Sequence, residues 1–140
     1  MLEVIPQSGS IVVYHQTYEI SRFKELARDF PEHAQAINDL ILRVVDLKKV
    51  IMDTVYYHGF LGSFSIKKVA PVLLGDQASY HHLEVGDGIE AMLSYQKMLD
   101  LDSSKSKKEE IRKDLLKYCK QDTLLMVHLH NWLLNVFFNK

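Results

Sequence analysis

Two side chains near the end of the chain have types and a spacing that suit hydrolytic chemistry. Tyr118 and Asp122 lie four residues apart in Tyr118-Cys-Lys-Gln-Asp122, within a stretch of helical pattern. Residues four apart share one face of a helix, so a phenol beside a carboxylate can orient a water on a metal ion. The apolar residues that follow predict a largely buried helix, where an ionised Asp needs a cation or a hydrogen-bond donor. Alternatively, Asp122 caps a helical turn or meets Lys120 at the surface.

A second carboxylate, Glu19, follows a short run of β-branched residues. Residues 10–14 read Ser-Ile-Val-Val-Tyr without polar alternation, which predicts a strand buried on both faces of a parallel sheet. Glu19 then lies near the carboxyl end of that strand, where α/β folds place ligands. The alternative is an ordinary acidic residue in the first turn of a helix, where the helix dipole favours it.

The elements that must position these carboxylates follow a strand, helix, strand order. Thr17 is the expected N-cap of the first helix, and Pro31 opens the next one. Residues 43–46 predict a second short strand, which leads into a helix over residues 47–54. The expected fold class is therefore α/β and helix-rich, with a small parallel sheet.

The second half of the chain predicts helices. One is expected to stop at Gly75, and Gly86-Asp87-Gly88 precedes another. Residues 100–110 are polar and lysine-rich, which predicts a mobile surface linker. From Ile111 to the end the pattern is helical, and it predicts two helices that meet near Tyr118.

Composition narrows the class of protein. The chain has 140 residues, 47% of them hydrophobic and 25% charged, which suits one globular domain over residues 1–140. Lys and Arg (17) nearly balance Asp and Glu (18), so any contact with nucleic acid must be local. A single cysteine, Cys119, excludes an intrachain disulfide framework and fits a cytoplasmic protein. The apolar runs are too short to span a bilayer, and the N-terminus does not follow the order of a signal peptide, so no membrane contact is expected.

Four segments, in this order along the chain, resemble a family of nucleases. GSIVVYHQTYE, GSFSIKKVAPVL, DGIEAMLSY and LLKYCKQDTLLMV look like the bacterial domain-of-unknown-function family 2779, which is placed in the ribonuclease-H-like DEDD 3′-5′ exonuclease superfamily. The pair Tyr118 and Asp122 resembles the third motif, YxxxD, of the tyrosine subclass. The resemblance spans nearly the whole chain, and it implies the C-terminal part of a ribonuclease-H-like exonuclease fold.

The resemblance implies hydrolysis of a 3′-terminal phosphodiester by two Mg²⁺ or Mn²⁺ ions that four carboxylates hold. Glu19 matches the second-motif acid and Asp122 the third-motif acid, so both would be metal ligands. Tyr118 matches the tyrosine that positions the attacking water. Glu19 stands where most relatives place an Asp, and its side chain reaches one methylene further.

Four other residues are candidate substrate contacts. His15 falls where many relatives place an Asn, and Asp46 approaches the same end of the sheet from the second strand. Lys67 and Lys68 could contact phosphates of a nucleic-acid 3′ end. The alternatives are that Asp46 caps the helix that follows it and that the two lysines form a solvated face.

Histidine pairs invite a zinc interpretation, which the spacing does not favour. His81 and His82 are adjacent on a loop and would need further ligands. His128 and His130 are two residues apart, so they point away from each other on a helix.

The first acidic motif of the resembled family, an Asp-x-Glu on the opening strand, occurs nowhere in the chain. Two of four carboxylates remain, so this chain alone is expected to have little or no nuclease activity. The strands that should carry that motif are missing as well, which leaves one edge of the strand at residues 11–14 open. That edge would pair with a longer polypeptide of which this chain is part, with a second copy or with a partner.

Two other functions are compatible with the same residues. The chain could be a catalytically dead module of the same ancestry that binds nucleic acid or protein. It could also be a helical interaction domain in which Tyr118 and Asp122 have only structural roles.

Overall fold

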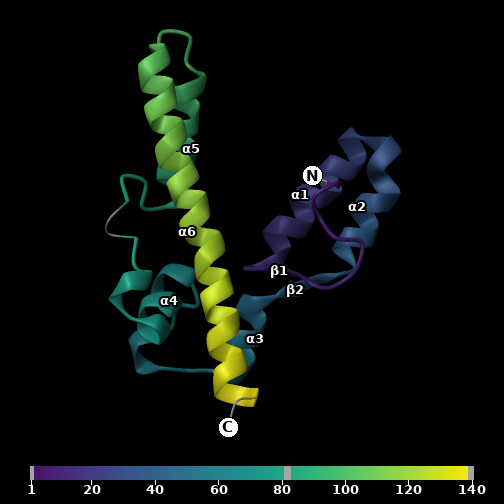
Figure 1. Cartoon of the computed structure of the whole chain (residues 1–140), viewed down its shortest axis with the longest axis vertical. Helices are drawn as coiled ribbons and strands as arrows, with labels where there is room; N and C mark the ends of the chain where they lie inside the picture. Colours follow the sequence, from purple (N-terminus) through teal and green to yellow (C-terminus); the bar gives the residue numbers. More distant parts are fainter. Residues whose placement is uncertain (1, 81–82, 139–140) are drawn as a thin grey trace. The chain divides into compact units, whose positions relative to one another are not determined.

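The structure of the 140-residue chain is a computed structural model that describes residues 2–80 and 83–138. It divides into two compact units, Met1–Ile66 and Lys67–Lys140, which are called here the N-terminal and the C-terminal unit (Figure 1). The prediction of one domain over residues 1–140 stays a prediction. Each unit is described by itself below.

The N-terminal unit is built around a two-stranded parallel sheet. Ile11 pairs with Val44 and Val13 with Asp46, so the two strands run in the same direction. Two helices connect the strands, as the parallel arrangement requires, and Figure 1 shows them packed beside each other. The elements are β1 (Ile11–Val13), α1 (Gln16–Asp29), a 3-10 turn (Pro31–His33), α2 (Ala34–Ile41), β2 (Val44–Asp46), α3 (Leu47–Thr54) and a second 3-10 turn (His58–Phe60).

The predicted strand, helix, strand order is confirmed, but the predicted burial of the first strand is wrong. Val13 is buried, whereas Val12 is 37% exposed on the other face. A two-stranded sheet gives each strand only one strand neighbour, and among the described residues no third strand adjoins β1. The most buried side chains of the unit are Ile51 on α3 and Phe60 in the loop after it, both fully buried. Phe60 meets the ring of Phe64 edge-on, with centroids 5.7 Å apart.

All the regular secondary structure that is described in the C-terminal unit is helical. Helix α5 packs along the N-terminal part of α6 (Figure 1). As predicted, Gly75 follows the end of α4 and adopts a positive φ of 89°, which a glycine tolerates without strain. Asp87 is the N-cap of α5, because its carboxylate accepts hydrogen bonds from the N–H groups of Ile89 and Glu90. The elements are α4 (Ile66–Leu74), a 3-10 turn (Asp76–Ala78), α5 (Gly88–Leu99) and α6 (Lys105–Phe138).

Helix α6 overturns two predictions. It starts at Lys105, inside the segment that was expected to be a linker, and it continues through Tyr118 without a break. Ser104 provides the start, since its hydroxyl accepts a hydrogen bond from the N–H of Lys107. Lys107 then pairs with Glu110 one turn later, at 3.0 Å. A polar segment of lysine and glutamate is thus a good helix former at the surface, where no apolar stripe is needed.

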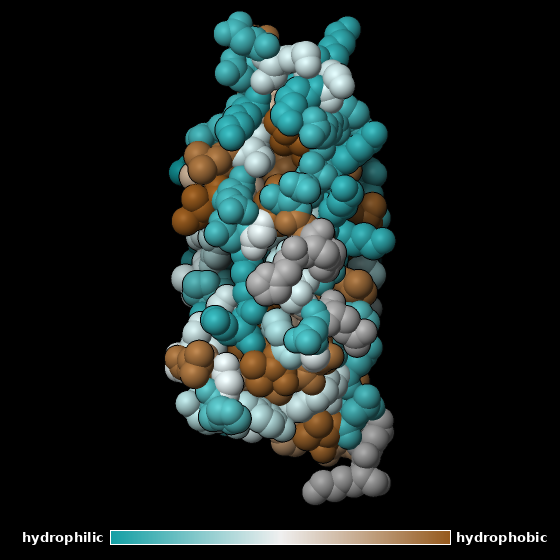
Figure 2. Space-filling model, turned by 90° about the vertical axis from the view of Figure 1, so that its left-hand side faces the viewer, coloured by the Kyte–Doolittle hydropathy of each residue, from teal (hydrophilic) through white to brown (hydrophobic). Residues whose placement is uncertain are grey.

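The buried side of α6 carries leucines at helical spacing. Leu125 and Leu129 are almost fully buried, and Leu133 is 6% exposed. On α4, Val69 and Ala70 are fully buried as well. Figure 2 shows one face of the molecule, on which hydrophobic patches interrupt a mostly hydrophilic surface. Within the described residues, no helix combines the length and the apolar character that a bilayer span requires.

Candidate functional site

The carboxylate of Asp46 joins the ends of the two strands in the N-terminal unit. Its oxygens accept hydrogen bonds from the N–H groups of His15 at 2.9 Å and Gln16 at 3.1 Å, at the start of α1. The same carboxylate caps α3, through the N–H of Lys48 at 3.0 Å. Three backbone donors at two helix N-termini suit a negative charge, because these N–H groups lack partners within their helices. The capping interpretation of Asp46 is therefore confirmed, and its contact with substrate stays a prediction.

This contact with Asp46 also explains how α1 begins. His15 is the N-cap and adopts a left-handed conformation with φ 76°, which is uncommon for a residue other than glycine. Its own side chain makes no capping hydrogen bond, so the carboxylate from the neighbouring strand replaces a local cap. The prediction that Thr17 caps the helix is wrong, since Thr17 lies within α1.

Glu19 lies in the first turn of α1 and is half-buried. The helix starts three residues after β1 ends, which puts Glu19 near the carboxyl end of the parallel strands, as predicted. Five residues earlier, the hydroxyl of Tyr14 donates a hydrogen bond to the carbonyl of Phe64 at 2.8 Å. Burial, assisted by the negative charge of Asp46, raises the pKa of Tyr14 well above its ordinary value.

In the C-terminal unit, two phenols converge on the carboxylate of Asp122. The hydroxyl of Tyr80 donates a hydrogen bond to Oδ1 of Asp122. Burial and then the charge and hydrogen-bonding of Asp122 raise the pKa of Tyr118 well above its ordinary value. The two tyrosine rings lie close to each other, with centroids 6.0 Å apart. The shared helix face predicted for Tyr118 and Asp122 is thus confirmed. The contact of Tyr80 with Asp122 could not be predicted from the spacing, because the two residues lie far apart in the sequence.

The ammonium group of Lys67 completes this cluster. It lies 5.1 Å from the ring centroid of Tyr80 and 5.5 Å from that of Tyr118, within the range of cation–π attraction. It also donates a hydrogen bond to the carbonyl of Gly86 at 2.6 Å. The alternative of a solvated lysine face is therefore wrong for Lys67, whereas Lys68 is exposed. Lys67, Tyr80, Tyr118 and Asp122 are called here the tyrosine–aspartate cluster.

The tyrosine–aspartate cluster does not by itself fit a divalent metal ion. Magnesium requires near-octahedral coordination by oxygen atoms, and carboxylates are its usual protein ligands. Asp122 is the cluster's one carboxylate, and its Oδ1 accepts a hydrogen bond from the hydroxyl of Tyr80. Among residues 2–80 and 83–138, no group of three or more His, Cys, Asp or Glu side chains could hold a metal. His81 and His82, which raised the zinc question, lie outside the described residues.

The predicted site residues divide between the two units. Glu19, His15 and Asp46 belong to the N-terminal unit, and Tyr118 and Asp122 belong to the C-terminal unit. The structure brings His15 to Asp46 through the backbone, and Tyr118 to Asp122 through their side chains. That Glu19 converges with Asp122 stays a prediction.

Comparison with known proteins identifies a similarity in the N-terminal unit. Residues 1–65 match a family model described as "Domain of unknown function (DUF2779)". The matched residues form β1 to α3 and the loop after α3, and they end where the N-terminal unit ends. Of the four segments that had suggested the same family, the match covers GSIVVYHQTYE and only the first residues of GSFSIKKVAPVL, and it does not extend to the segments around α5 and Tyr118. No curated protein and no solved structure matches the chain significantly.

Proposed function

We propose that this chain is the C-terminal part of a metal-dependent 3′-5′ exonuclease-like domain that is inactive by itself. The observation that carries the proposal is that the side chains of Tyr118 and Asp122 interact on one face of α6. In the resembled YxxxD motif, a tyrosine positions water beside an aspartate that binds Mg²⁺ or Mn²⁺. Such an ion would supply Lewis-acid activation of that water when bound. In this chain Asp122 would be the carboxylate that holds the ion, and Tyr118 would be the phenol that orients the water.

A second carboxylate supports the same proposal from the N-terminal unit. Glu19 follows β1 at the carboxyl end of a parallel sheet, the usual place for ligands in α/β folds. In the proposed domain it is the second metal ligand, and the helix start that Asp46 fixes determines its position. His15, Lys67 and Lys68 remain candidate contacts for the 3′ end of DNA or RNA.

The open edge of β1 is part of the proposal. The described sheet has the order β1-β2, so one edge of β1 has no strand neighbour among the described residues. Unpaired N–H and C=O groups on such an edge favour pairing with another strand. We propose that the missing strands of the domain, on a longer polypeptide, or a second copy pair there. Light scattering over a dilution series distinguishes the two possibilities. A chain that stays monomeric at every concentration excludes pairing with a second copy.

A catalytically dead module that binds nucleic acid or protein is the second candidate. One observation favours it, because Tyr80 donates a hydrogen bond to the carboxylate that a metal would need. A hydroxyl donor satisfies the charge of Asp122 without an ion. In that case Asp122 holds the α6 helix to the loop at Tyr80, and the nuclease chemistry has been lost.

Binding of Mn²⁺ to the full 140-residue chain tests the choice. Paramagnetic resonance of free Mn²⁺ measures the affinity of the wild type, Glu19→Gln, Asp122→Asn and the double variant. If both carboxylates hold one ion, the double variant binds no more weakly than the weaker single variant, because each single change already disrupts the shared site. Glu25→Gln and Glu109→Gln are controls on the same two helices, since Glu25 pairs with Arg22 and Glu109 with Arg112 at the exposed surface.

Two outcomes would reject the nuclease proposal. One is that Glu19→Gln and Asp122→Asn leave Mn²⁺ binding unchanged, and the other is that their effects simply add. The dead module would then be preferred if the chain retained binding to a labelled single strand without metal. A chain that cleaves a labelled 3′ end unaided would contradict the expected inactivity.

The compartment is part of the proposal as well. Cys119 is a free, exposed thiol in the structure. An exposed lone thiol persists in a reducing environment, which supports our proposal of a cytoplasmic location.

A further inference from the structure

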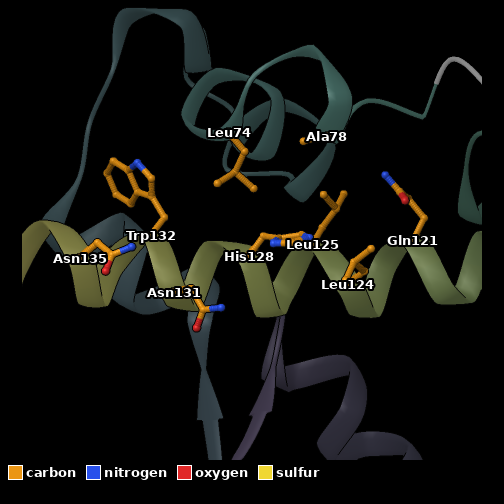
Figure 3. A pocket seen from close by; sticks show the side chains of 9 residues that line it. All are labelled: Leu74, Ala78, Gln121, Leu124, Leu125, His128, Asn131, Trp132 and Asn135. Carbon is orange, nitrogen blue, oxygen red and sulfur yellow. The ribbon is translucent and has the colours of Figure 1, made fainter.

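The C-terminal unit contains a pocket that lies apart from the contacts of the tyrosine–aspartate cluster. The pocket has a volume of about 310 Å³ and lies between α6 and the segment formed by the end of α4 and the following 3-10 turn. This volume is at the lower end of the range of about 300–1,000 Å³ for small-molecule sites. Figure 3 shows Trp132, Leu125 and Gln121 pointing from α6 toward Leu74 and Ala78 on the opposite side.

The pocket has an apolar floor. Ala78 and Leu125, which are 3% and 2% exposed, form its packed base. The apolar surface that a ligand can still cover comes from Leu124, which is 41% exposed, and from the half-buried Leu74. Trp132 is half-buried at one end, and its large indole ring is available for stacking. An apolar floor beside an aromatic ring suits a flat, partly apolar ligand.

The polar groups of the pocket are amides and an imidazole. Asn131 carries an amide and His128 an imidazole, so they offer both hydrogen-bond donors and acceptors. The amide nitrogen of Gln121 already donates a hydrogen bond to the carbonyl of Ser79, at 3.4 Å. Among the lining residues that the structure describes, none is an Asp, Glu, Lys or Arg. A phosphate or carboxylate ligand would need a cationic partner, and a fatty acyl chain would not use the amides. A neutral ring with donors and acceptors on its edge uses both the floor and the amides.

We infer that this pocket binds a nucleobase, which stacks on Trp132 and forms hydrogen bonds with His128 and Asn131. Aromatic side chains stack on any base, and amides read the hydrogen-bonding edge of an exposed base. The base could belong to a free nucleoside or to a single-stranded nucleic acid. The inference depends on the pocket alone, so it holds whether or not Glu19 and Asp122 share a metal ion.

The fluorescence of Trp132 gives a direct assay, because it is the one tryptophan of the sequence. We expect adenosine, cytidine, uridine or thymidine to change this fluorescence saturably when titrated into the full chain. Short single strands of the same bases and an abasic strand of equal length form the second arm. Quenching by nucleosides identifies a free small molecule as sufficient, whereas quenching only by base-containing strands identifies a nucleic acid.

Two α6 histidines give a matched pair of variants. His128→Leu should weaken nucleobase binding roughly fivefold to tenfold, the loss expected for one hydrogen bond in a preformed site. His130→Leu changes the same residue type two positions along the helix, outside the pocket, and should leave the affinity unchanged. Asn131→Leu should weaken binding by a similar factor. Circular dichroism checks that each variant is folded, and Gln121→Ala replaces any variant that is not.

Several results would overturn the inference. They are the lack of saturable quenching by any nucleoside or base-containing strand, equal quenching by the abasic strand, and equal affinity of His128→Leu and wild type. Asp122→Asn separates this test from that of the proposed function, because Asp122 does not line the pocket. If Asp122→Asn loses its Mn²⁺ response but still binds nucleosides, the result supports both the proposed nuclease function and the nucleobase pocket. A wild type that binds nucleosides without a carboxylate-dependent Mn²⁺ response rejects the nuclease alone.

Discussion

The phenol of Tyr80 donates a hydrogen bond to the carboxylate of Asp122, 42 residues later in the sequence. The contact ties the loop after the 3-10 turn at Asp76–Ala78 to the middle of α6. Because Lys67 lies against the rings of Tyr80 and Tyr118, the positive charge, the two phenols and the carboxylate form one connected unit. Its stability and its titration can both be measured.

Tyr80→Phe is expected to destabilise the C-terminal unit by about 1–3 kcal/mol, since it removes a hydrogen bond to a charged, half-buried acceptor. Urea unfolding followed by circular dichroism measures the change. Tyr95→Phe is the control, because Tyr95 is exposed on α5. Equal stability of the two variants would mean that Asp122 gains nothing from Tyr80.

Tyr118 should make the folded chain sensitive to alkaline pH. Its pKa is raised in the folded state, so the folded state favours the protonated phenol. The corresponding stability is fully present below the unfolded pKa of about 10 and is lost as the pH rises further. We expect Tyr118→Phe to be less sensitive than wild type above about pH 10, in urea titrations repeated across this range. A parallel loss in both proteins would contradict the raised pKa.

Asp46→Ala is expected to destabilise the N-terminal unit by about 1–3 kcal/mol, because three backbone N–H groups lose their acceptor. Asp53→Ala is a control on the helix that Asp46 caps, since Asp53 only pairs with Lys49 at the exposed surface. Chemical denaturation of both variants provides the comparison. If Asp53→Ala cost as much as Asp46→Ala, the capping account would be wrong.

Leu129→Ala should cost about 2–5 kcal/mol, since Leu129 is fully buried and its truncation leaves a cavity. Leu116→Ala, on the same helix, should change the unfolding free energy by much less, because Leu116 is 53% exposed. Thermal and urea unfolding of the pair measure the difference. A small effect at Leu129 would show that the surroundings of α6 can collapse into the space.

Local signals determined much of the chain. The helix predicted over residues 47–54 has the observed bounds, because Asp46 is an effective cap and the residues after it are helix formers. The glycine at position 75 ends α4 for a similarly local reason. The mistaken linker before Ile111 had a local signal too, in Ser104 and the lysine–glutamate spacing that follows it.

Other features depended on contacts between residues far apart in sequence. That Asp46 replaces Thr17 as the cap of α1 follows from the parallel pairing of β1 with β2, which sets the carboxylate beside His15. No sequence pattern around Tyr80 predicts its hydrogen bond with Asp122. The pocket beside Trp132 likewise depends on tertiary structure, because it forms between the end of α4 and α6. The sequence by itself determined most of the elements of the N-terminal unit and the pairing of Tyr118 with Asp122, because helix geometry brings residues four apart together. Tertiary structure alone decided which distant groups satisfy that carboxylate, since a hydrogen bond between distant segments depends on their packing and leaves no periodic trace in the chain.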